Sequence, residues 1–250
     1  MTTNLNGTGI DTYFSAALEL QLRVVERQRP LLIQVAAAMQ ERIRLRQRIF
    51  IFGTGHSHML AEEAFYRAGG LAAIVPIFSS ALMLHEHPEF GSRVERTPGL
   101  AESLLANYQP QPGEMIFIVS NSGVNHLPVE MALAARTQGL LVVSISSFAY
   151  ALVAPLSALG RRLDEVADLA IDNGCPPGDA LAPIAGTDWR VGPGTSVITA
   201  LIWNCLITEA AYQLKSMGEI PPVFISLNIP GARQHNEGLL AEWRSGNPHF

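Results

Sequence analysis

The amino-acid sequence predicts an α/β fold in which a parallel sheet is covered by helices on both faces. Short, continuous apolar runs typical of buried strands occur at residues 49–52, 72–78, 115–119, 140–146 and 167–171. Segments with helical character separate these runs, at 58–68, near 98–108, at 126–138 and at 150–161. Parallel strands are buried on both faces and need crossover connections, which are usually helices. The alternation therefore predicts a doubly covered parallel sheet.

Two helices are predicted ahead of the sheet, within residues 11–45. Asp11 is a suitable N-terminal cap, and apolar residues recur after it at helical spacing: Phe14, Leu18, Leu22 and Val25. Pro30 lacks a backbone N–H and is predicted to interrupt the chain before a second helix, from Leu31 to about Leu45. A basic cluster follows, which we interpret as a solvated helix end: Arg42, Arg44, Arg46 and Arg48.

A long loop and the most apolar helix follow the last predicted strand. The loop, 172–194, contains five glycines and four prolines and is long enough to be functional. Thr195 or Ser196 can cap the helix, which runs from Val197 to about Met217 and is either central to the core or an oligomer seam. A tail, 218–250, ends the chain. We predict a single domain over 1–250 with a core of about 35–217.

Composition and charge exclude several classes of protein. The 17 basic and 22 acidic side chains give a net charge of −5, the wrong sign for gripping nucleic acid. Cys175 and Cys205 have no spacing that suggests zinc or disulfides, which favours a reducing cytoplasm. The amino terminus lacks the features of a signal peptide, and the apolar run 197–207 is too short to span a membrane. We expect a soluble, cytoplasmic protein with no nucleic-acid or membrane partner.

Two strands run directly into small, hydroxyl-rich loops that precede helices. The first loop is Gly53-Thr54-Gly55-His56-Ser57, and the second is Ser120-Asn121-Ser122-Gly123-Val124-Asn125. A helix start carries unpaired N–H groups and a partial positive charge, so each loop can hold a phosphate. A dinucleotide site is disfavoured because His58 stands where its third glycine belongs, and no Gly-Lys-Ser/Thr is present. Two such loops predict one phosphorylated ligand, the alternative being that they only turn the chain.

These two loops resemble those of the sugar isomerase, or SIS, domain family, whose members include phosphoheptose isomerase and N-acetylmuramic acid 6-phosphate etherase. The likeness is closest to small single-domain members. It implies a three-layer, Rossmann-like or flavodoxin-like fold with a five-stranded parallel sheet, a homo-oligomer and a phosphosugar near a subunit boundary. By position it implies phosphosugar binding by Gly55, His56, Ser57, Ser120, Asn121, Ser122 and Gly123, and by Asn125, where the family usually has threonine or serine.

The reaction that the family implies needs a general base, and its position in this chain is open. In phosphoheptose isomerase and the etherase, a catalytic glutamate lies where this chain has Arg67, which cannot act as a base but can bind a carboxylate or hydroxyls. The candidate acid/base residues are Glu63, with Glu62 as its alternative, His85 and Glu209. An exposed helix face and a buried structural hydrogen bond are the alternatives for the glutamates. Asn204 is a candidate for binding substrate hydroxyls.

The run His85-Glu86-His87 also raises the possibility of zinc, with a fourth ligand from His56, His58 or His235. A loop histidine that acts on substrate is the preferred interpretation, and we predict neither a metal nor an organic cofactor. The leading hypothesis is a cytoplasmic homodimer or tetramer that isomerises an aldose or ketose phosphate by proton transfer. The alternatives are a non-catalytic phosphosugar sensor, and a lyase or etherase in which Arg67 reads an acid group.

Overall fold

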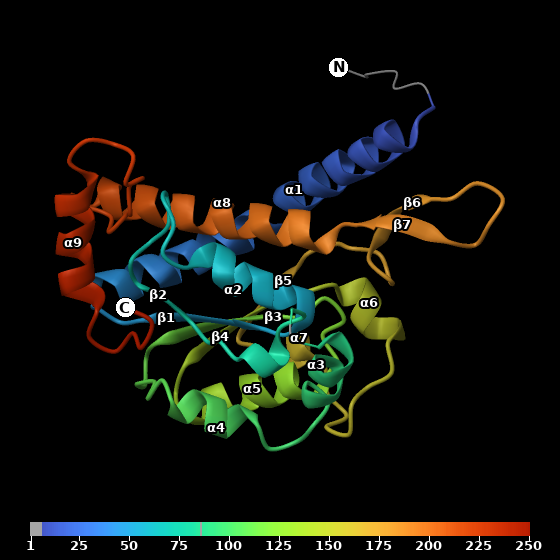
Figure 1. Cartoon of the computed structure of the whole chain (residues 1–250), viewed down its shortest axis with the longest axis horizontal. Coiled ribbons are helices and arrows are strands. Elements are labelled where there is room, and N and C mark those ends of the chain that lie inside the picture. Colours follow the sequence, from blue (N-terminus) through green and yellow to red (C-terminus); the bar gives the residue numbers. More distant parts are fainter. Residues whose placement is uncertain (1–6, 86) are drawn as a thin grey trace.

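The computed structural model describes residues 7–85 and 87–250, and their main sheet has the predicted parallel form. Five strands pair in the order β2-β1-β3-β4-β5, and every pair is parallel (Figure 1). Their bounds are β1 (Ile49–Gly53), β2 (Ile74–Pro76), β3 (Met115–Val119), β4 (Leu141–Ser146) and β5 (Leu169–Asp172). Each strand overlaps a predicted apolar run, so the predicted α/β fold class with a five-stranded parallel sheet is confirmed.

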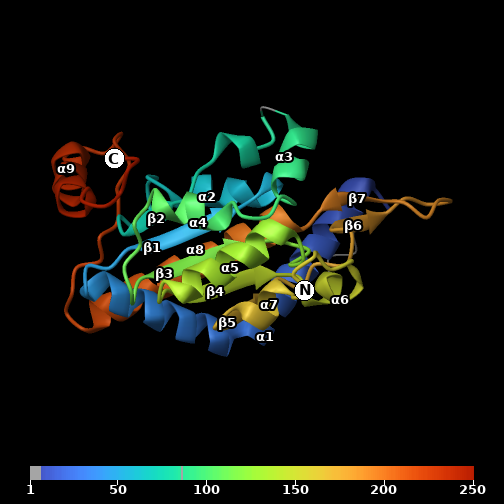
Figure 2. The same ribbon diagram turned by 90° about the horizontal axis from the view of Figure 1, so that it is seen from below.

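Helices cover both faces of this sheet (Figures 1 and 2). On the face of Ile49 and Ile51 lie α1 (Gly9–Arg44), α2 (His58–Ala64) and α8 (Thr195–Ser216). On the face of Phe50 and Phe52 lie α4 (Ala101–Ala106), α5 (His126–Thr137) and α7 (Leu163–Val166). Because successive strand residues point to opposite faces, each buried strand contributes to both halves of the core.

The shorter elements lie mainly at the two ends of the strands. At the carboxyl ends are η1 (Gly55–Ser57), η2 (Ser80–Leu82), α3 (Pro88–Val94) and α6 (Phe148–Val153) (Figure 1). The helix α9 (Ala232–Trp243) lies near the amino ends. The predicted loop 172–194 contains a two-stranded antiparallel hairpin, β6 (Ala180–Pro183) and β7 (Arg190–Pro193). The hairpin is tied to α1 by the hydroxyl of Tyr13, which donates to the carbonyl of Pro193 at 2.8 Å.

The predicted break at Pro30 is wrong, because α1 continues through this residue as a single helix. A proline inside a helix removes one backbone hydrogen bond, yet tertiary packing supplies most helical stability in folded proteins. Here Leu20 and Val24 before the proline, and Val35 and Met39 after it, are buried in the same core. The packing of α1 on both sides of Pro30 therefore stabilises it as one continuous helix.

Three predicted helices are also longer than those observed, for local reasons. α2 ends at Ala64, where Phe65 adopts an extended backbone and Tyr66 a positive φ of 42°. α6 ends at Val153, directly before the extended residue Ala154 and Pro155. α4 covers only 101–106 of the predicted 98–108. Proline disfavours the helical conformation in the residue before it, which accounts for the early end of α6.

The apolar helix α8 lies against α1 and the sheet, as its composition predicts for a core helix. By length and composition alone it could cross a membrane, because it has 22 residues and a mean hydropathy of 1.3. Its apolar residues have partners in the fold, however: Trp203 is buried and meets Phe117 of β3 edge-on, with ring centroids 5.2 Å apart. Contacts with α1 and β3 account for part of the hydropathy of α8, because 44% of its most apolar stretch is buried.

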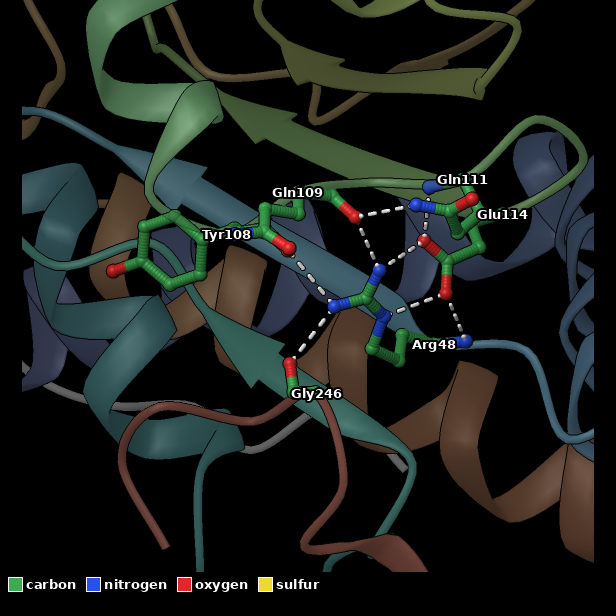
Figure 3. A network of polar contacts seen from close by, with 6 residues as sticks. All are labelled: Arg48, Tyr108, Gln109, Gln111, Glu114 and Gly246. Atoms are coloured by element: carbon green, nitrogen blue, oxygen red, sulfur yellow. Dashed lines mark hydrogen bonds and ion pairs between the residues drawn. The ribbon is translucent and has the colours of Figure 1, made fainter.

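The interpretation of Arg42 to Arg48 as a solvated cluster is wrong for two of its members. Arg48 forms a bidentate ion pair with Glu114, from Nε to Oε1 at 2.6 Å and from Nη2 to Oε2 at 2.8 Å (Figure 3). Its guanidinium also donates to the carbonyls of Tyr108, Gln109 and Gly246. The side chain of Arg42 is only 16% exposed. Arg48 thus joins the start of β1 to the start of β3 and to the tail.

Removing Glu114 should destabilise the chain strongly, since it leaves a guanidinium that is 12% exposed without its carboxylate. We expect Glu114→Ala to lower the free energy of unfolding by about 3–5 kcal/mol. Glu19→Ala is the matched control: its partner Arg23 is a surface residue, and the loss should be below about 1 kcal/mol. Urea unfolding measures both, and equal losses for the two variants would contradict this role of Arg48.

Candidate functional site

The two hydroxyl-rich loops lie side by side at the carboxyl edge of the sheet. β1 and β3 are neighbours, and Gly53 at the end of β1 pairs with Val119 at the end of β3. Loop one therefore leaves the sheet beside loop two, although 66 residues separate Gly53 from Val119. In open α/β sheets this edge is where ligands bind.

Loop one turns sharply and lines a cavity of about 330 Å³. Gly55 has a positive φ of 55°, and the N–H of Ser57 donates to the carbonyl of Thr54 at 3.0 Å, which closes the turn of η1. The cavity residues come from the loop and from the segment around η2 and α3: Thr54, Gly55, His56, Leu82, Leu84, Pro88, Gly91, Ser92 and Glu95. Of the predicted binding residues, Gly55 and His56 line it, while Ser57 is half-buried beside it.

Loop two lines a second cavity of about 510 Å³ at the start of α5. Ser122 and Asn125 line it, together with His126 of α5 and Arg96. The other predicted residues of this loop have internal partners. Ser120 is buried and accepts a hydrogen bond from the N–H of Gly123 at 3.3 Å. The side chain of Asn121 accepts from Asn173 at 3.1 Å.

Glu95 joins the two loops, and sequence reasoning did not single it out. Its Oε2 accepts from the hydroxyl of Thr54 at 2.7 Å, and its Oε1 accepts from the amide of Asn125 at 3.0 Å. Its backbone carbonyl accepts from the N–H of Leu127 in α5 at 2.9 Å. The neighbouring Arg96 also donates to Oε1, at 2.9 Å. One carboxylate thus connects loop one to the residue that precedes α5.

The candidate acid/base residues near loop one lie outside the lining of both cavities. Glu63, on α2, forms an ion pair with Arg67, which lies beyond the end of this helix. His85 is exposed and follows Leu84, which lines the loop-one cavity. Glu62 is half-exposed and lies 3.5 Å from Nδ1 of His58. Glu63 and Glu62 thus point to different partners, as adjacent helical residues must.

Glu209 and Asn204 lie in a different place from the loops. They line a groove of about 380 Å³ between α1 and α8, with Val25, Arg29, Leu32, Ile33, Cys205 and Thr208. Glu209 is half-buried and accepts a hydrogen bond from Gln213 at 2.8 Å. Within one described chain, these two residues are therefore not brought together with Ser122 or His56.

His58 is the most deeply buried titratable residue of the loop-one region. It is 1% exposed and stacks on Phe78 with ring centroids 5.2 Å apart. Neither ring nitrogen has a hydrogen-bond partner in the described part of the chain. Burial lowers the pKa of His58 below its usual value, although Glu62 acts in the opposite direction. His58 is therefore held as a neutral imidazole.

The zinc alternative finds no support among residues 7–85 and 87–250, where no three His, Cys, Asp or Glu side chains gather in a way that could hold a metal. Glu86 lies outside the described residues. His87 caps α3 instead, since its Nδ1 accepts from the N–H of Phe90 at 3.3 Å.

Burial raises the pKa of the Cys175 thiol to about 12, so this cysteine stays protonated and unreactive.

Comparison with known proteins defines the class to which this fold and these loops belong. The model of the SIS domain matches residues 12–147, which is more than half of the chain. The chain belongs to the SIS domain family, as the loops predicted.

Within that family, its relatives include proteins named UPF0309. The chain is 40% identical to a UPF0309 protein of Brucella anthropi over 204 residues, covering 81% of this chain and 83% of that one. It is 36% identical to a UPF0309 protein of Brucella canis over 241 residues, covering 96% and 98%.

Solved structures show the same fold at low sequence identity. A phosphoheptose isomerase from Francisella tularensis has a TM-score of 0.54 and 13% identity, covering 84% of this chain and 98% of that one. A phosphoheptose isomerase from Neisseria gonorrhoeae has a TM-score of 0.53 and 15% identity, covering 83% and 97%. At this level of identity the likeness concerns the fold.

Stability should fall in mild acid because of His58. Its pKa is lower in the folded chain than in the unfolded chain, so the unfolded chain binds the extra proton. The stabilisation that His58 contributes as a neutral group is fully present above about pH 6.5, the ordinary pKa of histidine. It is lost as the pH falls below this value. Urea unfolding at pH 7.5 and 5.5 measures the loss.

His58→Phe keeps the stack on Phe78 and should make that loss smaller. His249, whose pKa burial also lowers, leaves a residual dependence of the same sign. His56→Phe is the matched control, because His56 is exposed and its replacement should leave the pH dependence unchanged. If the free energy of unfolding of His58→Phe depends on pH as strongly as that of the unaltered chain, His58 is not the source of the loss of stability in acid.

Proposed function

We propose that this protein binds a phosphosugar across its two loop cavities, with the phosphate at loop two. The observation that carries the proposal is the cavity at the start of α5. Asn125 occupies the N-cap position of this helix but its side chain does not cap it. The Leu127 N–H donates to the carbonyl of Glu95, and Pro128 has no N–H. Within the described residues, the His126 N–H is therefore the group that this first turn leaves for an anion, beside the hydroxyl of Ser122 and the guanidinium of Arg96. A phosphate there would meet a helix dipole, a hydroxyl donor and a cation.

The sugar end would extend toward loop one, where His56 and Thr54 line the adjoining cavity. Ser57, Ser120, Asn121, Gly123 and Arg67 remain proposed contributors, the first four through the shape of the loops. The absence of a phosphate-binding lysine fits a site that uses helix N–H groups and hydroxyls. The two free cysteines, Cys175 and Cys205, fit the proposed cytoplasmic location.

The reaction that we propose is aldose–ketose isomerisation by proton transfer between C1 and C2. A base removes the proton from C2 of the aldose and returns it to C1, while a proton passes from the C2 hydroxyl to the C1 carbonyl oxygen, so the molecule as a whole keeps its oxidation state. Glu63 and His85 flank loop one and are the proposed acid/base residues of this chain. Glu63 must leave its ion pair with Arg67 to reach a sugar.

Non-catalytic sensing of a phosphosugar is the second candidate function. It is favoured by the contacts of Glu95, because the carboxylate that lines the loop-one cavity already accepts hydrogen bonds from Thr54, Asn125 and Arg96. Proton exchange separates the two functions. An isomerase should exchange the C1 or C2 proton of a bound phosphosugar with deuterated water, as followed by NMR, whereas a sensor should bind the sugar and exchange nothing.

Ser122→Ala should weaken phosphosugar binding by about 10- to 100-fold. A hydrogen bond to a charged group contributes about 1.5–3 kcal/mol, and 1.4 kcal/mol is a factor of ten in affinity. Calorimetry with arabinose 5-phosphate and glucose 6-phosphate as first probes measures the change. Ser196→Ala, an exposed serine on α8, is the matched control and should bind as tightly as the unaltered chain. Equal affinities for both variants would contradict the phosphate site.

We also propose that the protein is a homo-oligomer that pairs through α1 and α8. The outer face of α1 carries a row of exposed apolar residues: Ile10, Phe14, Leu18 and Leu22. The row leads into the groove that contains Arg29 and Glu209. In a two-fold interface the same patch meets itself, so Arg29 of one copy can pair with Glu209 of the other. Such an interface would also bring Glu209 and Asn204 to a second copy.

Leu22→Glu should weaken this association, because it places a charge in the middle of the apolar row. Light scattering after gel filtration should give the oligomer mass for the unaltered chain and a smaller mass for the variant. Leu227→Glu is the matched control, since Leu227 is 58% exposed and lies in the tail. A monomeric unaltered chain, or an unchanged mass for Leu22→Glu, would contradict the interface.

A further inference from the structure

The contact between Glu95 and Asn125 determines which way the Asn125 amide faces. An ionised carboxylate can only accept hydrogen bonds, so the NH₂ group of the amide must face it. Glu95 has three donors around it, from Thr54 at 2.7 Å, Arg96 at 2.9 Å and Asn125 at 3.0 Å. The Nδ2 atom of Asn125 is therefore the one directed at Glu95.

The other end of the amide is left without a partner. An asparagine at an N-cap usually accepts a hydrogen bond from the second or third N–H of its helix. Asn125 makes no such bond, and its Oδ1 accepts no hydrogen bond from the described residues. Asn125 nevertheless lines the loop-two cavity with Ser122 and Arg96. A carbonyl oxygen without a partner among the described residues thus belongs to the wall of a cavity that also holds the hydroxyl of Ser122 and the guanidinium of Arg96, both of which can donate.

We propose that Glu95 is a positioning residue that turns Asn125 into a hydrogen-bond acceptor, and that Asn125 selects the sugar part of the ligand. This inference rests on the proposed function. A phosphate dianion offers only acceptors at its oxygens, so it matches Ser122 and Arg96 but not a carbonyl oxygen. A sugar hydroxyl or an amino group offers a donor. Asn125 therefore binds a hydroxyl or amine of the sugar next to the phosphate, instead of the phosphate itself.

The carboxylate of Glu95 also links Asn125 to the loop-one cavity. Thr54 holds the opposite oxygen of Glu95, and Thr54 lines the loop-one cavity. A change at Glu95 would release Thr54, Arg96 and Asn125, whereas a change at Asn125 would affect only the sugar contact. Sugar binding and phosphate binding are therefore separable by mutation at Asn125, since neither Ser122 nor Arg96 has a contact with Asn125 among the described hydrogen bonds.

The test compares affinities for inorganic phosphate and for sugar phosphates. The variants are Asn125→Ala, Glu95→Gln and Ser122→Ala, and Glu89→Gln is the matched control, because Glu89 is an exposed residue of α3 that pairs only with the exposed Arg93. The probes are inorganic phosphate, arabinose 5-phosphate, glucose 6-phosphate and glucosamine 6-phosphate, titrated by calorimetry and by ³¹P NMR. The side-chain amide signals of Asn125 are followed in parallel by ¹⁵N NMR without any ligand.

We expect Asn125→Ala to weaken the tightest sugar phosphate by about tenfold, the worth of one hydrogen bond, and to change phosphate affinity less than about twofold. Glu95→Gln should weaken the same sugar phosphate by about tenfold but should not weaken inorganic phosphate, because it frees the guanidinium of Arg96 from its carboxylate. Ser122→Ala should weaken both classes of probe, and Glu89→Gln neither. The Asn125 amide signals should move in Glu95→Gln and stay in Glu89→Gln. A purely structural role of Glu95 would weaken phosphate and sugar phosphate equally.

Three results would overturn all or part of the inference, and they are distinguishable. If the unaltered chain binds a sugar phosphate while Asn125→Ala weakens both probes equally or neither, Asn125 is not the sugar acceptor and the proposed function stands. If the unaltered chain binds inorganic phosphate but none of the sugar phosphates, the proposed function fails and the sugar-selecting role of Asn125 fails with it. Unmoved Asn125 amide signals in Glu95→Gln would overturn the positioning role of Glu95 in either case.

Discussion

The hydrogen bonds of Glu95 hold together three segments that are far apart in the sequence. The parallel sheet brings loop one and loop two to the same edge, because β1 and β3 are neighbours. It does not set the distance between the loops, and the carboxylate does so by accepting from Thr54 and Asn125. The backbone of the same residue holds the start of α5 through Leu127. The relative position of the two loops therefore depends on the hydrogen bonds of one half-buried carboxylate.

The opposite edge of the sheet is built in a similar way, around an ion pair. Arg48 and Glu114 join the starts of β1 and β3, and Arg48 also holds the tail through Gly246 (Figure 3). The same two strands are thus fixed at both ends by carboxylates with several donors, which leaves few alternative positions for the loops that follow them. This arrangement would preorganise the proposed phosphosugar site at the carboxyl edge.

The sequence predicted the strands, the helices around them and the two loops, because buried strands and helix starts leave local patterns. It did not predict Glu95 or the burial of Arg48, since their partners lie 41 and 66 residues away and no local pattern marks such pairs. The break expected at Pro30 failed for a related reason: the packing of α1 on α8 outweighs local propensity. Glu209 and Asn204 were placed on the correct helix, but helical periodicity could not tell which groove they face.

The central claim, a phosphosugar held with its phosphate at loop two, is tested most directly by a crystal structure of the protein with a bound sugar phosphate. Phosphate oxygens should lie within hydrogen-bond distance of the Ser122 hydroxyl and of the His126 N–H at the start of α5, with a sugar hydroxyl or amine at Oδ1 of Asn125. A ligand bound only in the groove between α1 and α8, or a phosphate held at a site remote from Ser122, would contradict it.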